Sequence, residues 1–99
     1  MSRMTREHAI AAIRAHEAEL RALGVKSLGI FGSIARDEAG PGSDVDVLVE
    51  FDGTTSFDGY MDLKDLLERA LERRVDLVTQ RALKPMVRPY VERDLIRVA

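Results

Sequence analysis

Residues 44–51, Asp-Val-Asp-Val-Leu-Val-Glu-Phe, constrain the fold of this chain more than any other stretch. Side chains two positions apart in a β-strand point to the same face. Asp44 and Asp46 therefore stand side by side. The opposite face of the strand is apolar and consists of Val45, Val47, Val49 and Phe51. Two carboxylates this close repel each other unless a cation lies between them, so the pair predicts a site for a divalent cation.

A glycine–serine turn precedes this strand. Gly32 lets a backbone approach a ligand closely, and Ser33 opens a short helix, to about residue 38, whose free N–H groups can hold an anion. Arg36 lies on the same side of that helix as Ser33, where its charge could meet a triphosphate. Alternatively, Arg36 only pairs with Asp37 or Glu38 in solvent. Because Mg²⁺ is commonly held by one or two carboxylates together with substrate phosphates, the sequence predicts a metal-assisted phosphate site.

A third acid lies in a short apolar segment, residues 75–79, which reads as another strand. Within it, Asp76 and Val78 share one face. A carboxylate in the middle of such a strand is costly to bury. We therefore expect Asp76 to point into the same site as Asp44 and Asp46.

The remaining elements follow from apolar periodicity and from turn residues. We expect a helix at residues 5–23, a strand at 27–31, a helix at 58–73 and a short helix ending near residue 93. The first helix has Thr5 or Ser2 as its N-cap. His16, on its apolar stripe, is expected to have a structural role. Residues 54–56 are polar and expected to be mobile, and the last residues form either an edge strand or the end of the preceding helix.

Composition describes one domain, residues 1–99, that is 45% hydrophobic and 32% charged. The chain has no cysteine and no apolar run of about 18 residues. With no signal-peptide core at its start, these features favour a cytoplasmic protein that spans no membrane. Residues 37–68 hold ten acids against Lys64 alone, within a net charge of −2. Direct nucleic-acid binding is therefore not expected.

Gly32-Ser33-Ile34-Ala35-Arg36, then Asp44-x-Asp46 and later Asp76, resembles the DNA polymerase beta-like nucleotidyltransferase superfamily. The length and residues 75–79 are similar to its minimal branch, the MNT proteins. The resemblance implies an α/β (α+β) fold, a small mixed sheet of three to four strands flanked by helices. It further implies that Gly32 and Ser33 contact the nucleotide's phosphates, that Asp44 and Asp46 hold two Mg²⁺ ions, and that Asp76 completes the metal and catalytic site.

The same resemblance implies a function and a partner. The chain would transfer AMP from ATP to a hydroxyl, a tyrosine of a HEPN-domain toxin, and so act as that toxin's antitoxin. No segment remains for an acceptor-binding domain, so we expect the acceptor on another chain, in a homo- or hetero-oligomer. Two alternatives stay open. The chain could neutralise the toxin by occlusion alone, without catalysis, or it could transfer a nucleotide to a small molecule.

Overall fold

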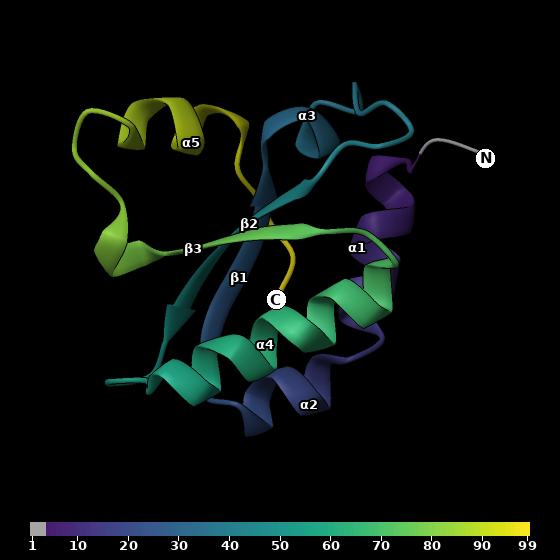
Figure 1. Ribbon diagram of the computed structural model, residues 1–99. Coiled ribbons are helices and arrows are strands. Elements are labelled where there is room, and N and C mark those ends of the chain that lie inside the picture. Colours follow the sequence, from purple (N-terminus) through teal and green to yellow (C-terminus); the bar gives the residue numbers. More distant parts are fainter. Residues whose placement is uncertain (1–3) are drawn as a thin grey trace.

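A four-stranded mixed sheet forms the centre of the molecule (Figure 1). The computed structural model describes residues 4–99. Its strands are β1 (Val25–Phe31), β2 (Val45–Phe51), β3 (Val75–Thr79) and β4 (Ile96–Arg97), in the order β3-β2-β1-β4. β2 runs parallel to β3 and antiparallel to β1, and β4 pairs antiparallel with β1. The predicted mixed sheet is confirmed, and the end of the chain is an edge strand.

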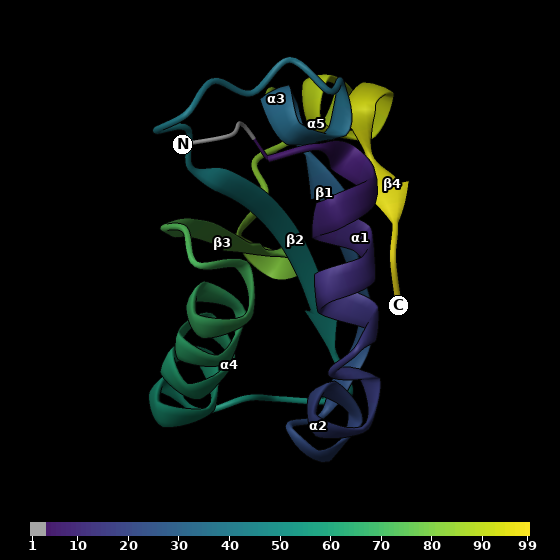
Figure 2. The ribbon, with the colours of Figure 1, turned by 90° about the vertical axis from the view of Figure 1, so that its right-hand side faces the viewer.

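Helices cover both faces of this sheet, as Figures 1 and 2 show together. The helical elements are α1 (Arg6–Arg14), α2 (Glu17–Ala22), α3 (Gly32–Ala35), α4 (Phe57–Leu71), the 3₁₀ turn η1 (Gln80–Ala82) and α5 (Arg88–Asp94). Apolar side chains of α1, α2 and α4 share one core with the strands. α5 packs over the other face, where its Val91 meets Leu48 and Leu83.

The alternation predicted for residues 44–51 explains this layering. Val45, Val47 and Val49 have no exposed surface and lie in the larger core. Leu48, between them, points to the α5 side and is also buried. Because side chains alternate along a strand, Asp46 shares the face of Leu48, which is the less covered face of the sheet.

The single helix predicted at residues 5–23 is wrong, because the chain forms two helices with a turn at residues 15–16. α1 packs against α3 and α4, whereas α2 packs against β1, so the chain changes direction between them. His16 begins the second helix, and its Nδ1 lies 2.7 Å from Glu19 Oε1. Thr5 caps α1 by accepting a hydrogen bond from the His8 backbone N–H. The alternative cap, Ser2, lies outside the described residues.

α4 begins at Phe57, directly after the segment (residues 54–56) that is expected to be mobile. Ser56 is its N-cap, and the Ser56 hydroxyl accepts a hydrogen bond of 3.0 Å from the Gly59 N–H. α4 ends at Leu71, and Glu72, which caps it, adopts a left-handed conformation. Within residues 4–99, no helix is both long and apolar enough to cross a bilayer.

Candidate active site

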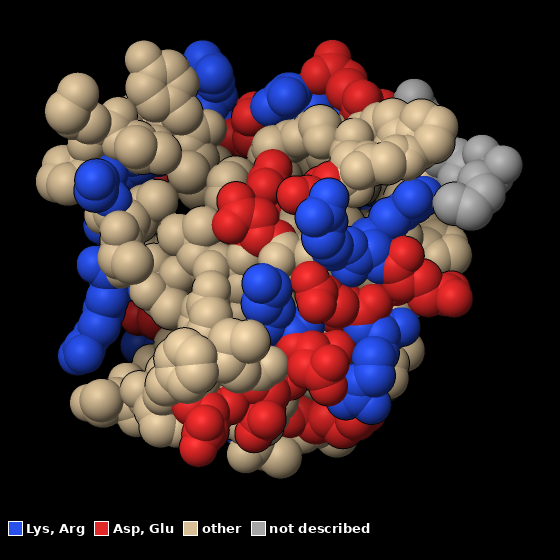
Figure 3. Space-filling view, viewed as in Figure 1, with Lys and Arg blue, Asp and Glu red and all other residues tan. Residues whose placement is uncertain are grey.

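Two neighbouring strands, β2 and β3, bring the predicted acids to one end of the sheet. Asp46 is paired in register with Phe31 of β1 on one side and with Asp76 of β3 on the other. Asp44 lies just before β2 and therefore beside them. In Figure 3, carboxylates gather near the centre of the visible face, over the region where β2 and β3 lie below α3 in Figure 1. The structure thus places the two predicted acidic strands side by side.

Asp46 is the least exposed of the three acids, and its charge is affected by the other two. Its side chain is half-buried, whereas Asp44 and Asp76 are exposed. Burial raises the pKa of Asp46 above its ordinary value, and the negative charges of Asp76 and Asp44 raise it further. The Arg36 guanidinium acts in the opposite direction and lowers the pKa of Asp46. The three carboxylates therefore form one coupled, negatively charged group.

The donor set suits a hard divalent cation, since carboxylate oxygens are the ligands that Mg²⁺ prefers. Between residues 4 and 99, no three acidic or histidine side chains are already arranged closely enough to hold one ion. Asp44 Oδ1 lies 3.6 Å from Arg74 Nε, and the Arg74 side chain is 86% exposed. Such an exposed ion pair is worth only about 0–1 kcal/mol. Asp44 can thus turn from Arg74 toward a cation at little cost.

Gly32 lies directly against Asp46. Its φ of 71° is in the left-handed region, which glycine adopts without strain. A Cβ at this position would contact Asp46 Oδ2 and lie 3.2 Å from Asp46 Cγ. Glycine is therefore needed here for a second reason that the sequence did not reveal: it leaves room for the central carboxylate of the site.

The helix after Gly32 is shorter than the predicted span of residues 33–38, because α3 ends at Ala35. Asp37 adopts a left-handed φ of 60°. The Glu38 N–H donates to Ser33 O and the Asp37 N–H donates to Ile34 O, the hydrogen-bond pattern that ends a helix. One helical turn has only a small dipole. A phosphate beside Ser33 would therefore depend on individual donors and on nearby cationic side chains.

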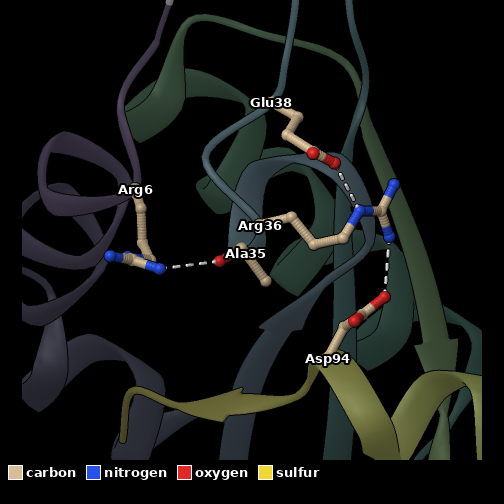
Figure 4. Close-up of polar contacts among 5 residues, drawn as sticks. All are labelled: Arg6, Ala35, Arg36, Glu38 and Asp94. Carbon is tan, nitrogen blue, oxygen red and sulfur yellow. Dashed lines mark hydrogen bonds and ion pairs between the residues drawn. The ribbon is translucent and has the colours of Figure 1, made fainter.

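Arg36 is held by two carboxylates, as Figure 4 shows. Its Nε lies 2.8 Å from Glu38 Oε1, and its Nη1 lies 2.6 Å from Asp94 Oδ2 on α5. These hydrogen bonds, that of Glu38 first and then that of Asp94, raise the pKa of the guanidinium. The predicted pairing with Glu38 is present, but the alternative that Arg36 only pairs with Asp37 or Glu38 in solvent is too narrow, because Arg36 also pairs with Asp94. Pairing with Asp94 was missed, because no sequence signal links residues 58 positions apart.

A separate groove of about 460 Å³ lies at the other end of β2 and β3. Its polar walls come from the loop before α4 and from the start of η1, and include Thr54, Thr55, Thr79, Gln80 and Arg81. None of the predicted site residues lines this groove, so it is distinct from the acidic site.

Comparison with known proteins gives consistent results. Residues 13–98 match the model of the nucleotidyltransferase domain family. Protein adenylyltransferase MntA of Thermococcus cleftensis is 39% identical over 99 residues, which cover 99% of this chain and 100% of that protein. A solved structure of a candidate minimal nucleotidyltransferase is 36% identical, with a TM-score of 0.83, and the match covers 97% of this chain and 98% of the other.

A more distant likeness concerns the fold alone. A toxin–antitoxin crystal structure with AMP-PNP contains a chain that is 23% identical, with a TM-score of 0.74. The match covers 91% of this chain and 72% of that chain.

Proposed function

The chain belongs to the nucleotidyltransferase domain family, in its minimal branch, and from this premise we propose that it is a protein adenylyltransferase acting as an antitoxin. Its reaction would be the transfer of AMP from ATP to a tyrosine hydroxyl of a HEPN-domain toxin in the cytoplasm. The name of the Thermococcus relative, protein adenylyltransferase, supports the reaction class. The toxin–antitoxin structure with AMP-PNP, whose fold is similar, makes a toxin partner and an adenine nucleotide the first candidates to test.

One observation carries this proposal: Asp46 lies in register with Asp76 and against Gly32. A nucleotide bound beside the glycine turn would have its phosphates next to the acids. Coupled carboxylates with a raised pKa at Asp46 are typical of a functional site rather than of an ordinary protein surface. If Asp46 and Asp76 lay on opposite faces of the sheet, the chain could be proposed only as a toxin-binding protein without catalysis.

The proposed mechanism assigns a task to each residue of the site. Gly32 and Ser33 admit and contact the phosphates, and Arg36 adds a positive charge beside them. Asp76 is exposed and can accept the proton of the incoming tyrosine hydroxyl. The phenolic oxygen then forms a bond to the α-phosphorus while the bond between the α-phosphorus and the bridging oxygen breaks, and pyrophosphate leaves. The product is a tyrosine–AMP phosphodiester.

Asp44, Asp46 and Asp76 would hold the cation that this reaction requires. Mg²⁺, when bound there, would neutralise the phosphate charges and stabilise the attacking and departing oxygens. The residues fit such an ion in their chemistry, since all three are carboxylates and their mutual repulsion favours a bound cation.

The test is direct. We would incubate the purified chain with ATP, Mg²⁺ and the HEPN-domain protein encoded beside it, and measure the mass of the partner. We expect the partner to gain AMP and Asp44→Asn with Asp46→Asn to abolish the gain. Asp62→Asn is the matched control, because this exposed carboxylate lies on α4, across the sheet from the site. An unchanged partner mass with the wild-type chain would overturn the proposal.

A further inference from the structure

Asp94 is remote in sequence from every predicted site residue, yet it contacts one of them. It is the last residue of α5, and its Oδ2 lies 2.6 Å from Arg36 Nη1 (Figure 4). The Asp94 side chain is only 15% exposed, whereas the other carboxylate partner of Arg36, Glu38, is 65% exposed. A charge-assisted hydrogen bond in the less exposed position is the stronger constraint. Asp94 is thus the more shielded of the two carboxylates that hold the Arg36 side chain.

Neighbouring contacts hold both Asp94 and Arg36 in place. Val91 buries α5 in the smaller core, one turn before Asp94. On the other side of the contact, the Arg6 side chain donates to Ala35 O at 3.1 Å (Figure 4). The Arg6 backbone N–H also donates to Asp37 at 3.0 Å. Hydrogen bonds from α1 therefore fix the backbone turn that carries Arg36, and Asp94 on α5 fixes the Arg36 side chain.

Arg36 needs such an anchor because it lies beside a negatively charged group. Its backbone N–H donates to Gly32 O at 3.1 Å, and Gly32 lies directly against the Asp46 carboxylate. A guanidinium free to move would pair with the nearest carboxylates of that group and compete with a cation for them. Held by Glu38 and Asp94, it uses two of its five N–H donors, and three remain for a phosphate.

We propose that Asp94 is a positioning residue for nucleotide binding, which acts through Arg36. It holds the guanidinium at the edge of the acidic site, where it meets the phosphates of the nucleotide, and keeps it off the carboxylates that receive the cation. This inference rests on the proposed function, since it requires that a nucleotide and a divalent cation bind at this end of the sheet.

The test measures binding of AMP-PNP in the presence of Mg²⁺ by calorimetry, without any partner protein. We expect Arg36→Gln to weaken binding about tenfold or more, the loss of one charged hydrogen-bonding group. Asp94→Asn should weaken it about three- to tenfold, because the guanidinium is kept but no longer fixed. Adding Asp94→Asn to Arg36→Gln should have no further effect, and Asp94→Glu should restore part of the affinity.

Two further readouts separate positioning from a general structural role. In Asp94→Asn, the Mg²⁺ concentration that gives half-maximal AMP-PNP binding should rise, because Arg36 now competes for the acids. In the transfer assay, the KM for ATP should rise while kcat at saturating ATP stays within about twofold. Glu92→Gln removes an exposed carboxylate from the same helix and serves as the control that should change neither value.

The outcomes distinguish this inference from the function on which it rests. If the wild-type chain binds no AMP-PNP with Mg²⁺, the proposed function itself fails. If the wild type binds and Asp94→Asn binds equally well, only the positioning role is overturned. The positioning role is also overturned if Asp94→Asn weakens binding as much in the Arg36→Gln background as in the wild type. Asp94 would then not act through Arg36.

Discussion

Replacing Asp46 with asparagine is expected to stabilise the ligand-free protein while abolishing its activity. The carboxylate is half-buried in register with Asp76, and its pKa is raised by burial and then by Asp76 and Asp44. A carboxyl group whose pKa rises on folding destabilises the folded state at every pH above that raised value. Asparagine has nearly the same shape and no charge, so the substitution removes the repulsion without leaving a cavity.

The magnitude follows from the spacing of the strands. Neighbouring strands lie about 4.8 Å apart, so side chains in register on one face carry charges roughly 5 Å apart. Two like charges at that distance repel by about 3 kcal/mol at an effective dielectric constant of 20 and by about 1 kcal/mol in water. Because this site opens to solvent and Arg36 partly offsets the repulsion, the lower figure applies. A gain of about 1 kcal/mol corresponds to a rise in Tm of roughly 4–8 °C in a domain of this size.

Thermal melts with EDTA at several pH values test this prediction. The gain in Tm for Asp46→Asn should be complete at neutral pH, shrink as the pH falls through the raised pKa, and vanish below about pH 4, where the carboxyl is protonated in both states. Asp62→Asn, on exposed α4 surface, should change Tm little. An unchanged or lower Tm for Asp46→Asn at pH 7 would refute the electrostatic argument.

Adding Mg²⁺ and AMP-PNP should reverse the order of stability. A ligand at 100 times its Kd stabilises the folded state by about 2.7 kcal/mol, and only the wild type retains the full set of ligands. The wild-type chain should then melt above Asp46→Asn. The same melts without nucleotide, with Mg²⁺ alone, would separate the contribution of the cation.

Three further predictions concern other contacts. Gly32→Ala should lower the free energy of unfolding by about 1–2 kcal/mol, because of its left-handed φ, and should also displace the Asp46 carboxylate and reduce transfer. Gly42→Ala is its control, since a Cβ there meets open space; equal activity of the two variants would contradict the role given to Gly32. Tyr60→Phe should cost about 1–2 kcal/mol in a chemical denaturation curve, as the Tyr60 hydroxyl donates a 2.5 Å hydrogen bond to Leu77 O. EDTA should abolish AMP transfer to the partner, measured by mass, and added Mg²⁺ should restore it; transfer that persists in EDTA would rule out a required metal.

The sheet could be predicted from the sequence because its strands carry strong local signals. Residues 75–79 form β3 with the predicted bounds, and the strand predicted at residues 44–51 begins one position later, at Val45. The proximity of Asp46 and Asp76 also followed from local reasoning, since each is an acid in an otherwise apolar strand. Burying a carboxylate among apolar residues is costly, and a shared cation site on the two strands would offset that cost for both acids.

Other features depended on tertiary contacts. The turn at His16 could not be predicted because the apolar stripe continues across it at helical spacing. The early end of α3 rests on Asp37, where the sequence offers no glycine at the usual left-handed position. The contact between Arg36 and Asp94 has no local signal at all, since α5 reaches α3 only through the packing of the whole chain.

The positions of Arg36 and Arg74 indicate that the repulsion among the three acids is retained for function. Arg36, close enough to lower the pKa of Asp46, is turned to Glu38 and Asp94, and Arg74 lies 3.6 Å from Asp44 in a highly exposed position. Arg36 offsets only part of the repulsion at Asp46, and Arg74 forms an exposed pair with Asp44. Elsewhere the same strand follows the rules of stable sheets, with Val45, Val47 and Val49 fully buried. A local conflict within an otherwise consistent strand is expected where function opposes stability, and a bound cation is the simplest way to resolve it.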